Sequence, residues 1–224
     1  MVLTLIAGSS RVGGLPELLH EIPGHLESIK LPGGHLPAIA NLVLNRLANA
    51  RPRDHPVHVY FVAGMPDCTT MIRQPGYQEV IFTGHPQDKV TAVLHTIMQT
   101  EAAVQNAGAT PVFCTIAPMS FKKWNNKRLG QGKTRELRYT HMYQDWQRRL
   151  NHTIATLNEH IHRINSNNSV QTPRLAESIF DVPQFERLPH LRYNRLEDGC
   201  HATPETKRKW ANELTATAKA NRVD

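Results

Sequence analysis

The stretch Val2-Leu3-Thr4-Leu5-Ile6-Ala7-Gly8-Ser9-Ser10 decides how the chain folds. Its first part is apolar and partly β-branched, which predicts a short buried strand. Gly8 ends this strand, and a serine just past the first strand of an open α/β sheet lies at the edge where such sheets bind ligands. Ser10 is therefore a candidate nucleophile, provided that a histidine activates it. The alternative is an ordinary turn, because Gly and Ser cluster in turns for backbone reasons alone.

The bulk composition indicates an ordinary globular protein. With 224 residues, 40% hydrophobic and 20% charged, the chain is long enough to bury a core and is neither disordered nor fibrous. We find no internal repeat and no long linker, so we expect one domain spanning residues 1–224. The formal net charge of +7 permits a polyanionic partner such as nucleic acid, but it says nothing about the fold.

Cysteine usage and hydropathy predict an intracellular protein, cytoplasmic or nuclear. Cys68, Cys114 and Cys200 form no CxxC pair and cannot build a disulfide framework, which favours a reducing compartment. The apolar start, residues 2–7, is too short for the core of a signal peptide. No apolar run approaches the length that a bilayer requires, so we expect no membrane partner.

Apolar patterns of strand type and helix type alternate along the chain. Strands are predicted at 2–7, 25–31, 58–64 and 111–117, with a fifth at 175–180, and helices at 36–47, 88–106, 146–164 and from 204 onward. Residues 65–86 and 118–140 are expected to be loops. This order is typical of βαβ units, and it predicts a parallel sheet between helical layers, a three-layer α/β/α architecture.

A second half of a site lies near the C-terminus, where the chain reads Glu197-Asp198-Gly199-Cys200-His201-Ala202-Thr203-Pro204. An Asp three residues before a His, ahead of a helix, can place its carboxylate against Nδ1 of the imidazole. The other ring nitrogen is then free to take a proton from a serine. Ser10, His201 and Asp198 would thus act as nucleophile, general base and orienting carboxylate.

At these residues the sequence resembles the SGNH (GDSL-like) hydrolases, a family of esterases and acetylhydrolases. The resemblance implies a flavodoxin-like parallel sheet of five strands over nearly the whole chain. Gly8-Ser9-Ser10 matches the family's Gly-Asp-Ser, and Asp198-Gly199-Cys200-His201 matches its terminal Asp-x-x-His. It implies no metal and no organic cofactor.

The resemblance also implies an oxyanion hole, and there the sequence departs from the family. The expected donors are the backbone N–H groups of Ser10 and of Gly33 or Gly34. Gly64-Met65-Pro66-Asp67 matches the Gly-x-Asn-Asp block, but Pro66 replaces the Asn that donates to the oxyanion. Proline offers no donor, and loss of one such donor costs about 10²–10³ in rate in a well-studied protease. Ser9 replaces the usual Asp, a supporting residue.

A basic segment follows the fourth predicted strand. Its cations and aromatics suit phosphate contact and base stacking, so it is a possible substrate or nucleic-acid site. The residues concerned are Lys122, Lys123, Trp124, Lys127 and Arg128. The alternatives are a solvated run of charge or a lid over the site.

Two functional hypotheses follow. The first is a serine esterase or acetylesterase that hydrolyses a small ester, or an acylated polymer, through an acyl-enzyme. The second is a catalytically impaired protein of the same fold that binds nucleic acid or a protein partner through its basic loops. Domains of this kind also occur in proteins of mobile elements and viruses, which the basic loops would fit.

Overall fold

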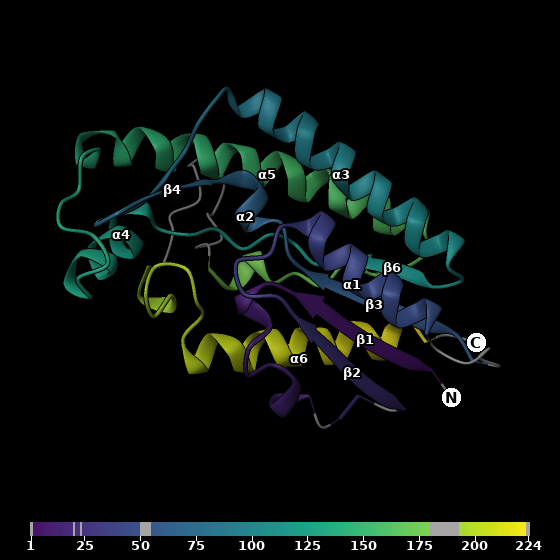
Figure 1. Ribbon diagram of the computed structural model, residues 1–224. Helices are drawn as coiled ribbons and strands as arrows, with labels where there is room; N and C mark the ends of the chain where they lie inside the picture. The colour runs from purple at the N-terminus through teal and green to yellow at the C-terminus, as the bar shows by residue number, and fades with distance from the viewer. Residues whose placement is uncertain (1, 20, 23, 50–54, 180–192, 223–224) are drawn as a thin grey trace, which may run out of the picture.

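A computed structural model describes residues 2–19, 21–22, 24–49, 55–179 and 193–222 (Figure 1). Its centre is a parallel sheet of four strands in the order β2-β1-β3-β6. The strands are β1 (Leu3–Gly8), β2 (His25–Lys30), β3 (Val57–Val62) and β6 (Thr110–Phe113). Since all four run the same way, the segments that follow them begin at one edge of the sheet.

The central strands are buried on both faces, which explains why they read as continuous apolar runs. In β1, Leu5 and Ala7 pack into one core, and Ile6 between them packs into the other. In β3, Phe61 and Tyr60 divide between the two cores in the same way. This alternation is the two-residue period of a strand.

Helices cover both faces, so the expected three-layer α/β/α architecture is confirmed. Figure 1 shows α1 (Leu36–Ala48), α3 (Pro86–Asn106) and α5 (Tyr143–Asn167) on one side of the sheet. The other side carries α6 (Pro204–Ala220). The apolar residues of α5 recur every three or four positions, and most of them are buried, among them Trp146 and Leu150. The described residues also include five short 3₁₀ segments, η1 (Ser10–Val12), η2 (Pro16–Leu18), η3 (Thr140–Met142), η4 (Ala176–Ser178) and η5 (Tyr193–Arg195).

The fifth strand expected at 175–180 is wrong for the described residues. Ala176–Ser178 forms η4, and Phe180 lies outside the described part of the chain. The edge of the sheet at β6 is instead closed by a side chain. Asn165 of α5 accepts from the Phe113 backbone N–H at 3.0 Å and donates to the Phe113 carbonyl at 2.7 Å. Because this side-chain amide satisfies the backbone N–H and carbonyl of Phe113, no further strand is needed to pair with them.

Both segments expected to be loops contain regular structure. Residues 65–86 hold α2 (Met65–Cys68) and an antiparallel hairpin of β4 (Thr70–Gln74) and β5 (Tyr77–Ile81). Residues 118–140 hold α4 (Phe121–Gly130), whose N-cap Ser120 accepts from the backbone N–H of Lys123. Only Phe121 and Asn125 of α4 are buried, so the helix lacks the apolar stripe by which a sequence reveals one.

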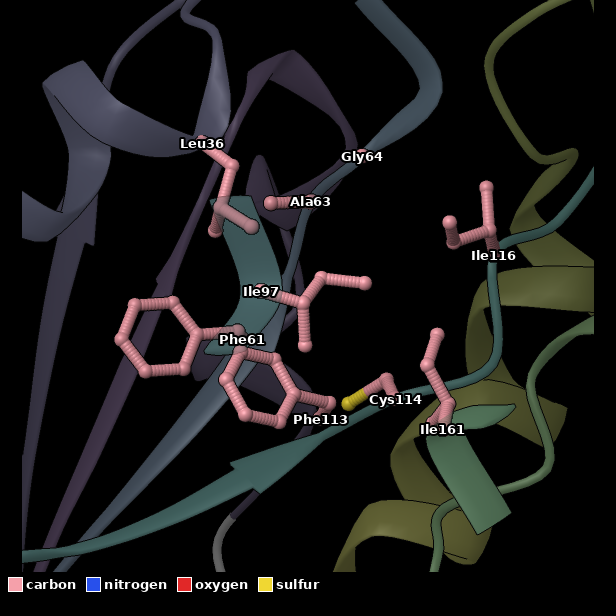
Figure 2. A pocket seen from close by; sticks show the side chains of 9 residues that line it. All are labelled: Leu36, Phe61, Ala63, Gly64, Ile97, Phe113, Cys114, Ile116 and Ile161. Carbon is pink, nitrogen blue, oxygen red and sulfur yellow. The ribbon is translucent and has the colours of Figure 1, made fainter. Parts of the chain in front are cut away.

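The main core leaves almost no internal space. Figure 2 shows Ile97 of α3 and Ile161 of α5 facing Phe61 and Phe113 of the sheet across an apolar pocket. The pocket measures about 10 Å³, roughly the room of one water molecule, so it offers no ligand site. Among the described residues, no helix is both long and apolar enough to cross a membrane.

Candidate active site

Ser10 is the first residue of η1, directly beyond the carboxyl end of β1. The approach of β1 to β3 requires Gly8, because a Cβ there would stand 2.3 Å from the Val62 carbonyl oxygen. This close contact turns the chain sharply at the edge of the sheet. Ser10 is half-buried and lines an open cleft, so its hydroxyl is accessible to a ligand.

His201 reaches Ser10 from the other end of the chain. Its Nε2 lies 2.8 Å from Ser10 Oγ, and its Nδ1 lies 2.7 Å from Asp198 Oδ2. A carboxylate accepts from Nδ1–H, which leaves Nε2 unprotonated and able to accept the serine proton. The three residues therefore come together in the arrangement that the sequence predicts.

The loop that carries Asp198 and His201 is closed on itself. The backbone N–H of Glu197 donates to the His201 carbonyl at 2.7 Å. Thr203 then caps α6 by accepting from the backbone N–H of Thr206 at 3.3 Å. The histidine thus stands on a short turn fixed at the start of a helix, which limits its movement.

The surroundings of Asp198 favour its ionised form. Burial alone would raise the pKa of this carboxyl, but hydrogen bonds from His201 and Cys200 outweigh burial and hold the pKa well below its usual range. Oδ1 accepts from the backbone N–H groups of Cys200 at 3.0 Å and His201 at 2.8 Å. Because both oxygens are engaged, the carboxylate is fixed in place and stays charged in neutral solution.

The two glycines expected at the oxyanion hole differ in the structure. Gly34 is buried, and its N–H already donates to the Leu31 carbonyl at 2.8 Å. Gly33 is exposed and lines the cleft beside Ser10. The expectation for Gly34 is therefore wrong, and Gly33 is the glycine with access to the site.

Pro66 lines the cleft on the first turn of α2, where it has no N–H to offer. Its neighbour Asp67 links α2 to the start of α1. Both carboxylate oxygens lie 3.1 Å from the backbone N of Leu36, and Nδ1 of His35 lies 3.4 Å away. Asp67 thereby fixes the turn that carries Gly33, a role that the sequence pattern alone did not reveal.

Part of α4 lies against the segment that carries Asp198 and His201. Trp124 packs on His201 with ring centroids 5.6 Å apart, and Lys127 Nζ lies 3.3 Å from Asp198 Oδ2. Lys123 donates to the Leu196 carbonyl. Arg128 lies over the Trp124 ring at 4.8 Å, and its Nη1 donates to Gln78.

Of the basic residues singled out in the sequence, Lys122 is exposed and lines no part of the cleft. Binding of nucleic acid remains a prediction without support from these contacts. The segment serves instead as a wall of the cleft.

The cleft in front of Ser10 has a volume of about 890 Å³. Besides the residues expected from the sequence, it is lined by the β4–β5 hairpin through Met71, Arg73 and Val80. Sequence reasoning missed this wall because the short, largely polar β4 lacks the apolar alternation of a buried strand. Arg11, next to Ser10, also lines the cleft although only 5% of it is exposed.

No group of three or more His, Cys, Asp or Glu side chains in the described ranges is placed to hold a metal ion.

Among known proteins, the chain is similar to solved structures that share one fold. No protein-family model matches it, and no curated protein matches it by sequence. Solved structures match over almost the whole length. A member of the lipolytic G-D-S-L family from Veillonella parvula aligns with a TM-score of 0.63 at 10% identity, covering 100% of both chains.

Two further solved structures are similar to this chain over nearly its whole length. A GDSL-like lipase from Bacteroides thetaiotaomicron gives a TM-score of 0.59 at 12% identity, covering 98% of this chain and 86% of that one. A lipase/acylhydrolase from Enterococcus faecalis gives 0.58 at 13% identity, covering 98% and 96%. The chain therefore has the fold of the SGNH (GDSL-like) hydrolases.

Proposed function

We propose that the protein is a serine esterase that hydrolyses short acyl esters through Ser10, His201 and Asp198. The observation that carries the proposal is the unbroken chain of short contacts, 2.8 Å from Ser10 to His201 and 2.7 Å from His201 to Asp198. Residues 191 positions apart in the sequence meet with the geometry that acyl transfer needs. The fold shared with lipases and acylhydrolases supports the same reaction class.

In this mechanism Ser10 Oγ attacks the ester carbonyl while His201 Nε2 takes the serine proton. The imidazolium that forms is stabilised by ionised Asp198 and then protonates the departing alcohol oxygen. Water, deprotonated by the same histidine, attacks the acyl-enzyme and releases the acid. Each proton thus passes through Nε2 and returns, so the protein is regenerated without a cofactor.

The oxyanion in this proposal is bound by the backbone N–H groups of Ser10 and Gly33. Pro66 supplies no third donor, which predicts a slower enzyme than one with the full set. Acetyl and other short acyl groups are the substrates of choice for a first test, and the alcohol can belong to a small molecule or a polymer.

The test is hydrolysis of 4-nitrophenyl acetate by the wild-type protein and by Ser10→Ala. The matched control is Ser166→Ala, the same chemical change at an exposed position of α5. We expect wild type and Ser166→Ala to turn over the ester at equal rates and Ser10→Ala to fall to the buffer background. A fluorophosphonate should label only proteins that retain Ser10, and mass spectrometry should locate the adduct on this residue. Equal rates in all three proteins, with no labelling, would refute the proposal and favour the binding hypothesis.

A further inference from the structure

The cleft in front of Ser10 has an uneven charge. The cations that line it are Arg11, Arg73, Lys89 and Arg128, and Asp67 is the only carboxylate among its lining residues in the described part of the chain. Within that part, none of the four cations forms an ion pair with a carboxylate. Among the described residues, these four cations therefore have no carboxylate paired directly with them.

The single carboxylate of the lining is already engaged. Asp67 accepts from the backbone N–H of Leu36 and lies against His35. Asp198, behind the cleft, is bound by His201 and Lys127. Neither acid is free to pair with the cations in front of Ser10.

Arg73 and Arg128 stand on two elements that pack together. Asn125 of α4 accepts from the Val80 backbone N–H at 2.8 Å and donates to the Val80 carbonyl at 2.9 Å, which joins α4 to the hairpin. Burial, and after it the positive charge of Arg73, lowers the pKa of Arg128. Both arginines line the cleft, and an anion bound between their guanidinium groups would relieve the repulsion between them.

Arg11 adds a buried charge beside the nucleophile. Its Nη1 donates to the Ala117 carbonyl and its Nη2 to the Pro118 carbonyl at 3.0 Å. Its Nε is buried and has no hydrogen-bond partner among the described residues. A permanent cation in a dry position raises the positive potential at the Ser10 end of the cleft.

Apolar side chains supply the rest of the wall. Met65, Met71, Val80, Met119 and Trp124 line the same cleft. The site therefore combines an apolar surface with four cations, of which Arg73 lies on the hairpin and Arg128 on α4, an arrangement that orients a ligand with one charged end.

We propose that the substrate is an anionic ester, a short acyl ester whose acyl or alcohol part carries a carboxylate or phosphate held by Arg73 and Arg128. This inference rests on the esterase function proposed above and adds the substrate class. The planar guanidinium groups match the paired oxygens of such anions and bind them better than a single ammonium does.

Two pairs of esters that differ only in charge test the proposal. Monoethyl succinate and ethyl butyrate carry the difference on the acyl side, and 4-acetoxybenzoate and 4-acetoxybenzamide carry it on the alcohol side. In wild type we expect kcat/KM for the anionic member of at least one pair to be about tenfold higher, mostly through KM, with the preference declining in salt. Hydrolysis of both pairs without any charge preference would overturn the proposal and leave the esterase function intact.

Substitutions of single arginines test whether the charge preference arises at Arg73. Arg73→Gln should lower kcat/KM for the anionic ester more than for its neutral partner and so abolish the preference, because Arg73 lines the cleft with an exposed side chain. Arg73→Lys should restore part of it. Arg163→Gln removes the same charge from the exposed surface of α5 and is the matched control. A loss of preference in Arg163→Gln as large as that in Arg73→Gln would contradict a local site.

A binding measurement separates this proposal from the esterase function. Chemical-shift titration of the Ser10→Ala protein with monoethyl succinate and ethyl butyrate needs no turnover. We expect the anionic ester to bind more tightly and Arg73→Gln to remove the difference. If wild type hydrolyses no ester and this difference is nevertheless found, the proposed reaction fails while the anion site stands. If the two esters bind equally, the anion site fails.

Discussion

The ammonium of Lys127 lies 3.3 Å from Oδ2 of Asp198, the oxygen that also accepts from His201 at 2.7 Å. A basic residue that the sequence offers to nucleic acid is thus the neighbour of the carboxylate that orients the histidine. Trp124, which the sequence also offers to nucleic acid, packs on the histidine itself. The basic helix and the catalytic loop form one structural unit.

Replacing Asp198 by Asn should lower kcat strongly. Asn can donate to Nδ1 and so favour the wrong tautomer of His201, a change that costs about 10⁴ in kcat in a serine protease. Lys127→Met should cost less than about tenfold, because the lysine side chain is 41% exposed and such pairs are screened by water. Steady-state hydrolysis of 4-nitrophenyl acetate measures both. An equal loss in the two variants would mean that Lys127 is as essential as the carboxylate.

Pro66→Asn should raise kcat. It restores a side-chain donor at the third oxyanion position, and the gain is limited to about the 10²–10³ that one such donor is worth. Pro66→Ala is the control, since it removes the proline ring without adding a side-chain donor. A rate increase in both variants alike would trace the effect to the backbone of α2 instead of to the oxyanion.

Gly199→Ala should disturb the contact between the catalytic loop and α4. Gly199 has φ of +87°, and a Cβ there would stand 2.7 Å from the backbone N of Trp124. Gly108→Ala is the matched control, with φ of +75° and no atom within 4 Å of the added Cβ.

For these two glycines we expect losses in the free energy of unfolding of about 1 kcal/mol for Gly108→Ala and more than about 2 kcal/mol for Gly199→Ala, from strain alone and from strain plus clash. Only Gly199→Ala should also lower kcat. Urea unfolding and ester hydrolysis on the same samples provide the comparison, and equal losses would contradict the clash.

Asp67 and Asp198 should influence the pH dependence of stability in opposite directions. Burial raises the pKa of Asp67 above its ordinary value of 3.8, an effect only partly offset by Leu36 and His35. The folded state therefore holds this proton more tightly, and the stability that it contributes is lost as pH rises through the raised pKa. Asp198, with a lowered pKa, contributes stability that is lost as pH falls.

The corresponding measurement is urea unfolding of wild type, Asp67→Asn and Asp198→Asn at several pH values. The free energy of unfolding of wild type relative to Asp67→Asn should decrease as the pH rises from about 4 through the raised pKa of Asp67. Relative to Asp198→Asn it should increase between about pH 2 and pH 5. Parallel curves for all three proteins would show that neither carboxyl has a shifted pKa.

Asn165→Ala should destabilise the fold by about 2–4 kcal/mol, because it leaves the buried N–H and carbonyl of Phe113 without partners. Asn158→Ala removes a similar pair of bonds to Ile116 at a half-buried position, where water can replace them. We expect a smaller loss there. Equal losses in thermal unfolding would mean that burial of the amide is unimportant.

The sequence by itself determined the layered sheet and the residues of the triad. Strands buried on both faces must be apolar throughout, so β1 and β3 can be predicted from the sequence alone. Asp198 and His201 lie three residues apart beside a capped helix, which makes their pairing a local matter. Their approach to Ser10 is seen only in the folded chain, because Ala176–Ser178, expected to be part of a strand ahead of this loop, forms η4.

Only the tertiary structure decided the walls of the cleft and the edge of the sheet. The helix α4 is held by Asn125 pairing with Val80, 45 residues away, and β6 is closed by Asn165 pairing with Phe113, 52 residues away. Neither pairing produces a periodic pattern of residues, so neither can be predicted from the sequence. The choice of Gly33 over Gly34 depends on a single hydrogen bond to Leu31, and the positive cleft depends on which cations face it. A pattern reports which residues must be buried, whereas polar partners far apart in the chain are fixed only when the chain has folded.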